Sequence, residues 1–159
     1  MGSKGGGGIS GEDLRPIAER VKGILRDGDQ PRKNVFLARA YEDEDQVNLF
    51  RGQAKNPASE LEFNDHSLKE PFDSQNSDYI RNGIREHIRR SSTTVVFLSD
   101  HAADSAWVDW EIRESVRLGK KVIGIYIGPT SPRLPSAFAE LGLRAIPWHH
   151  EDLMREMNA

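Results

Sequence analysis

The stretch that decides the fold is residues 93–127, TTVVFLSDHAADSAWVDWEIRESVRLGKKVIGIYI. It opens with an apolar, β-branched run at 93–98 and closes with a second apolar run at 121–127, and both runs are typical of strands buried on both faces. Between them lies a segment with helical periodicity that ends near Gly119. Two buried strands joined through a helix form a βαβ unit, so this stretch predicts a parallel sheet with right-handed connections.

The rest of the chain repeats this alternation of strands and helices. We expect further strands at 35–38, 61–63 and 144–147, and further helices at about 42–55, 79–88 and 151–157. The first of these helices is expected to turn Val47, Leu49 and Phe50 inward, and the second is marked by Tyr79, Ile80, Ile84 and Ile88. The predicted fold class is therefore α/β, with a short central parallel sheet flanked by helices.

The N-terminal 30 residues differ in character from the remainder. Residues 1–9 contain a run of glycines and predict a flexible tail. Residues 10–30 carry apolar side chains at helical spacing and predict an amphipathic helix with a linker, which either covers part of the same domain or serves as a docking helix. The domain proper is expected to span residues 31–159.

Composition excludes several classes of function. The chain has 159 residues, 36% of them hydrophobic, and a net charge of -3, which suits one globular domain and argues against a nucleic-acid-binding face. It has no cysteine, and its five histidines lack the spacing of metal ligands, so no metal site is expected. Without a membrane-spanning apolar run or a secretory signal, the sequence predicts a cytoplasmic protein that does not contact a membrane.

Glu111 stands out because it interrupts an apolar helix face. At about 100° per residue, that face carries Trp107, Val108, Trp110, Ile112, Ser115 and Leu118, while Asp109, Arg113 and Arg117 line the opposite side. A carboxylate among apolar side chains must be paired, neutralised or left in a cleft, since burying an unpaired charge costs several kcal/mol. Glu111 is therefore either a functional residue or a structural one that is satisfied by a partner such as Arg39 or a backbone amide.

Other candidate residues follow the predicted strands, because ligands of parallel sheets bind beyond the carboxyl ends of the strands. Arg39 and Tyr41 follow the first strand, where they would clamp a phosphate and stack on a ring, or else serve as a surface charge and a packing residue. Ser99 and Asp100 follow the strand at 93–98 and reach the same edge. Phe72, in the polar loop after the strand at 61–63, would cap a ligand, mediate self-association or anchor the loop.

Taken together, residues 34–147 resemble the TIR and TIR-like domains. The first strand running into the acidic Glu42-Asp43 is similar to the family's opening, and residues 64–77 stand where the family has its long loop. The most specific match, Ser105-Ala106-Trp107-Val108-Asp109-Trp110-Glu111, resembles the family's Ser-x-Trp-Cys-x-x-Glu signature, with Val108 at the cysteine position. Ala38-Arg39-Ala40-Tyr41 departs from the Ser-Tyr pair that many members carry at the end of their first strand.

The resemblance implies a flavodoxin-like three-layer fold and, within the family, is strongest to small bacterial TIR-like proteins of anti-phage defence, such as the TIR component of Thoeris systems. In catalytic members the glutamate of the signature supports cleavage of the nicotinamide–ribose bond of NAD, giving ADP-ribose or cyclised or conjugated ADP-ribose signals. The resemblance therefore implies that Glu111 is catalytic. It implies NAD as substrate rather than as a bound cofactor, contacted by Arg39, Tyr41, Phe72, Ser99, Asp100 and Trp107.

The same resemblance implies a homo-oligomer and a downstream effector that senses the nucleotide product. Other TIR domains only mediate assembly, so the alternative is a non-enzymatic signalling scaffold that self-associates through residues 64–77.

Overall fold

The structure, a computed structural model, describes residues 33–54, 61–65 and 71–159. The tail predicted at 1–9, the amphipathic helix predicted at 10–30 and the middle of the long polar loop lie outside the described residues. All the elements described below belong to one unit, residues 33–159.

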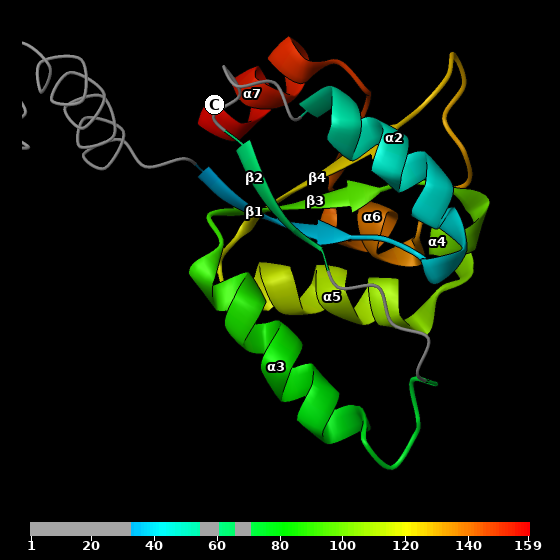
Figure 1. Ribbon diagram of the computed structural model, residues 1–159, viewed down its shortest axis with the longest axis vertical. Helices are drawn as coiled ribbons and strands as arrows, with labels where there is room; N and C mark the ends of the chain where they lie inside the picture. The colour runs from blue at the N-terminus through cyan, green and yellow to red at the C-terminus, as the bar shows by residue number, and fades with distance from the viewer. Residues whose placement is uncertain (1–32, 55–60, 66–70) are drawn as a thin grey trace, which may run out of the picture. The chain divides into compact units, whose positions relative to one another are not determined.

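The described strands form one parallel sheet (Figure 1). They are β1 (Lys33–Ala38), β2 (Leu61–Asp65), β3 (Thr93–Phe97), β4 (Lys121–Tyr126) and β5 (Arg144–Pro147). Their spatial order is β2-β1-β3-β4-β5, so the sequence-adjacent strands β1 and β2 are neighbours and β3 lies at the centre. This is the strand order of the flavodoxin-like doubly wound sheet, and the predicted fold class is confirmed.

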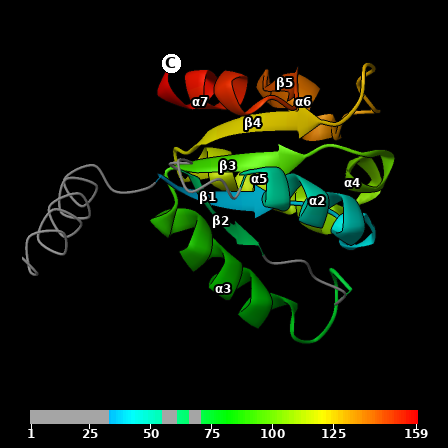
Figure 2. The same ribbon diagram turned by 45° about the horizontal axis from the view of Figure 1, so that its top comes forward.

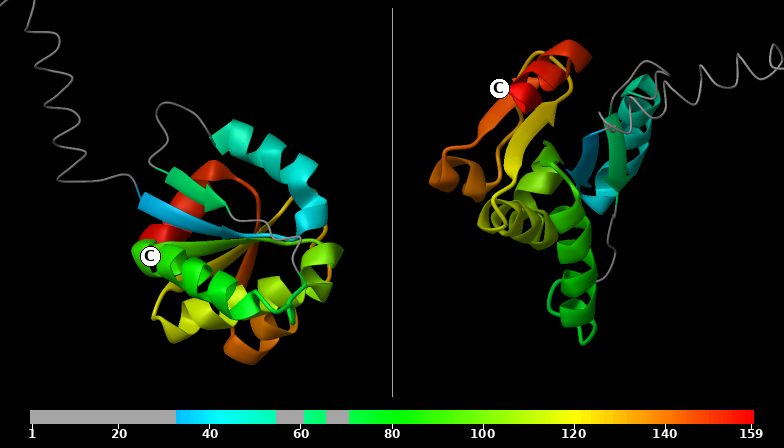
Figure 3. Two further views of the ribbon diagram at one scale, coloured as in Figure 1. Left: turned by 60° about the horizontal axis from the view of Figure 1, so that its bottom comes forward. Right: turned by 90° about the vertical axis from the view of Figure 1, so that its left-hand side faces the viewer.

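Helices cover both faces of the sheet and make three layers (Figures 1 and 2). The helical elements are η1 (Tyr41–Asp43), α2 (Glu44–Ala54), α3 (Ser77–Arg90), α4 (Asp100–Asp104), α5 (Ala106–Arg117), α6 (Ser136–Leu141) and α7 (His150–Asn158). On one face α2 and α7 pack against the strands, and on the other face lie α3, α5 and α6. When the molecule is turned, α2 stays above the sheet and α3, α5 and α6 stay below it (Figure 3, left).

The core divides at the sheet because alternate strand residues point to opposite faces. The buried side chains of Phe36, Ala38 and Val96 point towards α3, α5 and α6. There they contact Ile84, Ile88, Val108, Ile112 and Phe138. The side chains on the other face of the strands point towards α2 and α7. They are Val35, Leu37, Val95 and Phe97, which contact Val47, Phe50, Leu153 and Met157. Full burial of one such large apolar side chain contributes about 1.5–3 kcal/mol, so both faces of the sheet are major sources of stability.

One inward-facing assignment from the helical pattern is wrong. Leu49 is 72% exposed, because Val47 and Phe50 set the inward face of α2 and Leu49 lies about 100° of helix rotation from Phe50, away from Val47. The helix marked by Tyr79, Ile80, Ile84 and Ile88 is present as α3, in which Ile84 and Ile88 are buried and Tyr79 is 84% exposed.

Two short helices were not predicted, α4 and α6. The Ser99 side chain caps α4 by accepting a hydrogen bond from the Ala102 N–H, and Ser105 then caps α5 in the same way through Val108. In α6, Ala137 and Phe138 are buried against the α5 layer, and Gly142 ends the helix in the left-handed conformation. Both helices are too short to show a periodic apolar pattern in the sequence.

Within the described residues, no helix has both the length and the apolar character that a crossing of a lipid bilayer requires.

Gly124 allows a close approach between β4 and the helical layer. It lies in β4, and a Cβ atom at this position would come within 2.6 Å of Phe138 Cε2 and 2.7 Å of Leu98 Cδ1. Both of these side chains are buried, so neither can move without disturbing its neighbours. The glycine at this position of β4 is therefore a packing requirement for the position of α6.

Gly124→Ala is expected to destabilise the protein by about 1–3 kcal/mol, the usual range for forcing an extra methyl group into a filled core. Gly83→Ala is the matched control, since it adds the same methyl on the exposed side of α3, where nothing lies within 4 Å. That variant is expected to be neutral or to gain up to about 1 kcal/mol from helix propensity. Urea unfolding of the three proteins measures both effects, and equal stability of the two variants would contradict the packing role of Gly124.

Candidate functional site

The candidate site lies where the chain leaves the central strands β1 and β3. After β1 the chain passes into α2 on one face of the sheet, and after β3 it passes through α4 into α5 on the other face. Adjacent parallel strands whose connections diverge in this way form the switch point at which doubly wound sheets bind ligands. Arg39 and Tyr41 follow β1, and Ser99 and Asp100 follow β3, so the structure brings these predicted residues to one edge of the sheet.

A hydrogen bond between side chains joins the two strand ends. The Ser99 hydroxyl donates to Asp43 Oδ2, and the same Ser99 oxygen accepts a hydrogen bond of 2.9 Å from the Ala102 N–H. Asp43, at the end of η1, is buried although it carries a carboxylate. Ser99 therefore links the turn after β1 to the start of α4. This link fixes the position of one side of the switch point relative to the other.

Arg39 places a cation at the same strand end. Its side chain is buried and its Nη2 atom lies 3.8 Å from Glu44 Oε1, whose side chain is half exposed. A guanidinium stays charged at all physiological pH values and can contact two oxygens of one phosphate group. Tyr41 begins η1 and is 38% exposed, so its ring is available to solvent.

The position of Glu111 along the direction of the strands follows from a contact that Ser115 makes one turn later in α5. Ser115 Oγ lies 2.7 Å from Thr94 Oγ1, which places that turn beside the first half of β3. Because α5 begins after the end of β3 and finishes before the start of β4, it runs back against the strand direction. Glu111 therefore lies about 6 Å nearer to the strand ends than Ser115, which matches the rise from Thr94 to Val96.

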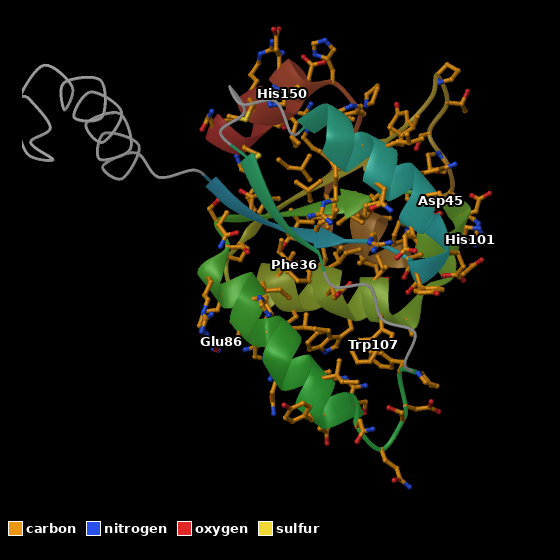
Figure 4. The ribbon with its side chains drawn as sticks, in the orientation of Figure 1. Phe36, Asp45, Glu86, His101, Trp107 and His150 are labelled. Carbon is orange, nitrogen blue, oxygen red and sulfur yellow. The ribbon has the colours of Figure 1, made fainter. Side chains whose placement is uncertain are left out.

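Val96 is opposite Ala38, the last residue of β1. Helical side chains tilt towards the N-terminus of their helix, so the Glu111 carboxylate is directed towards the ends of β1 and β3. Figure 4 shows Trp107, which is one turn before Glu111, at the end of α5 towards which the arrow of β1 points. Glu111 is only 2% exposed, as the helical pattern predicted, and it takes part in at least one hydrogen bond or electrostatic contact, so it is not an isolated charge.

A cluster of aromatic rings borders the first turns of α5. Trp107 meets the edge of Phe72 with ring centroids 4.9 Å apart, and meets Trp110 at 6.1 Å, both in T-shaped geometry. The Arg81 guanidinium lies 4.1 Å from the centre of the Phe72 ring and donates a hydrogen bond of 2.9 Å to the Phe72 carbonyl oxygen. Phe72 is thus anchored in the structure by Trp107 and Arg81.

Asp100 is exposed and is held by the connection between β4 and α6. Its Oδ1 atom accepts a hydrogen bond of 3.2 Å from the Arg133 N–H, and the Arg133 guanidinium pairs with both oxygens of Asp104 at 2.8 and 2.9 Å. The hydrogen bonds from Arg133 lower the pKa of the Asp104 carboxyl group below its ordinary value. Asp100 thus belongs to a polar junction between α4 and this connection.

Glu114 is a buried carboxylate on α5 that the sequence analysis did not single out. It accepts hydrogen bonds from Arg117, with Nε 2.7 Å from Oε1, and from Arg85 of α3. Those bonds lower the pKa of Glu114 to about 2 despite its burial, which by itself would raise the pKa. The ion pair ties α3 to the helix that carries Glu111, and Arg85 also lies 5.6 Å from the Trp110 ring.

Asp43 and Arg81 were likewise given no role by the sequence analysis. Asp43 pairs with Ser99, 56 residues away, and Arg81 contacts Phe72, nine residues away, and Trp107 on another helix, so no helical or strand period could identify these partners. Among the residues that the structure describes, no three His, Asp or Glu side chains gather as metal ligands would.

The family model described as "Thoeris protein ThsB, TIR-like domain" matches residues 36–131. The chain belongs to this family. The match includes the Ser105–Glu111 stretch and all seven residues named as site candidates.

Among solved structures, the fold is similar to the TIR domain of the Toll-related receptor TRR-2 from the lower metazoan Hydra magnipapillata, with a TM-score of 0.51. That similarity covers 79% of this chain and 98% of the Hydra chain at 16% sequence identity, which establishes a shared fold. No curated protein sequence matches this chain. The predicted membership of the TIR and TIR-like domains is confirmed.

Glu114→Gln is expected to change the dependence of stability on pH. The folded-state pKa of about 2 lies below the ordinary value of 4.5, so the ionised form stabilises the fold above pH 4.5 and this contribution is lost as the pH falls towards 2. The variant should lose about 1–3 kcal/mol at neutral pH and show a flatter decline in that acid range. Glu86→Gln, which removes a half-exposed carboxylate paired within α3, is the control and should cost below about 1 kcal/mol.

Urea unfolding at a series of pH values measures both variants. Curves for Glu114→Gln and the wild-type protein that run parallel between pH 4.5 and 2 would show that Glu114 does not contribute through its charge.

Proposed function

We propose that this TIR-like domain cleaves the bond between nicotinamide and ribose in NAD, with Glu111 as the catalytic carboxylate. The observation that carries this proposal is the position of Glu111. It is a buried carboxylate on α5, in the family's signature stretch, directed towards the switch point between β1 and β3. A buried acid aimed at the ligand-binding edge of a doubly wound sheet is a costly arrangement that a purely structural helix does not need.

The chemistry suits a single carboxylate. Loss of nicotinamide passes through an oxocarbenium-like state in which positive charge develops at the anomeric carbon of the ribose. Nicotinamide leaves readily because its departure discharges the pyridinium ring, so a strong general acid is not required. A carboxylate that orients the ribose hydroxyl groups and faces the developing charge lowers the barrier, and its effect is larger in a site from which water is excluded.

Several neighbouring residues are suited to hold the substrate in this scheme. Arg39 would contact the pyrophosphate, and the exposed Tyr41 ring would stack on a base or a nicotinamide. Ser99 and Asp100 would shape the β3 side of the site, since both already hold fixed partners there. Trp107 with Phe72 would form the apolar wall beside Glu111, and the anchoring of Phe72 favours this supporting role over that of a cap on nicotinamide.

The product in this proposal is ADP-ribose or a cyclised or conjugated ADP-ribose, released as a signal to a downstream effector. The family's Thoeris description favours a role in anti-phage defence, carried out in the cytoplasm. Incubation of the purified protein with NAD, followed by chromatography of the products, tests the activity and identifies the product in one experiment. Unchanged NAD over a wide range of protein concentrations would instead favour a non-enzymatic assembly module.

Glu111→Gln is expected to lower NAD cleavage by about two orders of magnitude or more, equivalent to about 3 kcal/mol of transition-state stabilisation. Glutamine keeps the shape of the side chain and a carbonyl acceptor but removes the negative charge, so the melting temperature should change little. Asp109→Asn is the matched control, because it removes a carboxylate from the other side of the same helix, where Asp109 pairs with Arg113. A less stable Glu111→Gln protein with wild-type turnover per folded molecule would remove Glu111 from the active site.

We expect the protein to self-associate and to be active as an oligomer. The activity should then rise more steeply than in proportion to the protein concentration. Phe72→Ala is expected to weaken this activity, because it removes the ring that holds the start of the segment before α3 against Trp107. Turnover assays and sedimentation on the same samples measure both effects. Strict proportionality together with a monomeric particle would show that each chain acts alone.

A further inference from the structure

Two hydroxyl groups form a polar chain inside the apolar layer between α5 and the sheet. Thr94 of β3 and Ser115 of α5 are both completely buried, and their oxygens lie 2.7 Å apart. The Ser115 hydroxyl also lies 2.7 Å from the backbone carbonyl oxygen of Glu111, to which it donates. Each hydroxyl has one hydrogen, so Ser115 uses its hydrogen on Glu111 and Thr94 must donate to Ser115.

These two hydrogen bonds form a chain that runs from the central strand β3 to the peptide group of Glu111. Thr94 belongs to β3, which pairs with β1 on one side and β4 on the other, so its position is set by backbone hydrogen bonds on both edges. The packing of Val108 and Ile112 against the sheet is apolar and non-directional, and it resists sliding or rotation of α5 less strictly than a hydrogen bond does. The two hydroxyls therefore supply a directional link between the sheet and the turn that carries the carboxylate.

Helix stability does not account for Ser115. Alanine is a better helix former at an interior position, and a serine that bonds back to the carbonyl one turn earlier slightly destabilises or bends its helix. Burial of two hydroxyl groups in an apolar layer also has a desolvation cost, which their mutual hydrogen bond only offsets. The Thr94–Ser115 pair thus costs stability and ends on the backbone of Glu111. This combination indicates that the position of Glu111 must be fixed.

We propose that Thr94 and Ser115 are positioning residues for catalysis, which hold the Glu111 carboxylate at the height and rotation at which it faces the ribose. This inference rests on the proposed NAD-cleaving function of Glu111. Neither hydroxyl touches the substrate, because both lie in the closed layer one turn further from the strand ends than Glu111. Their loss should therefore impair the chemical step while leaving substrate contacts at Arg39 and Tyr41 intact.

Thr94→Val is the central test, because valine has nearly the shape of threonine and leaves Ser115 free to donate to Glu111 without an unsatisfied donor. The expected result is a fall in kcat of about tenfold with KM unchanged, since displacement of a catalytic group affects the transition state more than substrate binding. Thr94→Ser, which restores the hydroxyl, should recover most of the lost kcat. Turnover is expressed per folded molecule, with the folded fraction taken from thermal unfolding.

Thr93→Val is the matched control. It removes a buried hydroxyl from the neighbouring position of the same strand, on the face that points away from α5. This variant should keep wild-type kcat per folded molecule. An equal loss of kcat in Thr93→Val and Thr94→Val would show a general effect of altering β3 and would contradict a positioning role.

A double-mutant comparison tests whether the two hydroxyls act as one chain. Ser115→Ala interrupts the chain at its centre, so adding Thr94→Val to it should lower kcat no further. If Ser115→Ala does not fold, the comparison of Thr94→Val with Thr94→Ser decides alone. Wild-type kcat in Thr94→Val overturns the positioning role and leaves the function of Glu111 standing, whereas absence of NAD cleavage by the wild-type protein, at every concentration tried, overturns both.

Discussion

The pairing of β3 on both edges is the constraint on which the rest of the structure depends. β1 and β4 hydrogen-bond to its two sides, α5 covers one of its faces and the α2–α7 layer covers the other. A strand enclosed in this way can carry only side chains that its neighbours accommodate, and every residue from Thr93 to Phe97 is buried. Its end also fixes the switch point, because Ser99 is the first residue beyond the sheet that reaches across to the turn after β1.

The helix α5 combines packing with two buried carboxylates, and the protein stabilises the two in different ways. Glu114 lies towards α3, where Arg85 and Arg117 neutralise it and keep it ionised. Glu111 lies one turn of helix nearer to the strand ends and points towards the edge at which doubly wound sheets bind ligands. Glu114 therefore connects α5 to α3, while Glu111 lies where the proposed cleavage of NAD would require a carboxylate.

Three sets of contacts surround the part of α5 that carries Glu111. Ser115, one turn later in α5, pairs with Thr94, Trp107 one turn earlier contacts the Phe72 ring, and the Asp43–Ser99 hydrogen bond joins the ends of β1 and β3. In the proposed cleavage of NAD, groups held by such contacts need not rearrange as charge develops on the ribose.

Much of the fold could be predicted from the sequence because buried positions recur with the period of a strand or a helix and are occupied by apolar residues. The apolar runs at 93–98 and 121–127 identified β3 and β4, and the 3.6-residue period around 105–118 identified α5 and the anomalous Glu111. That period also led to an error at Leu49, which faces solvent because Val47 and Phe50 set the buried face of α2. The helices α4 and α6 were missed since neither is long enough to display a period.

The sequence by itself determined which residues are chemically able to act: a glutamate on an apolar face, an arginine after a strand and a tryptophan one turn before the acid. Only the tertiary structure decided how they are held. The partners that meet from different elements are Asp43 with Ser99, Arg85 with Glu114, and Thr94 with Ser115. Such pairs leave no periodic signal, because a hydrogen bond or ion pair depends on the meeting of two surfaces and not on the spacing within either one.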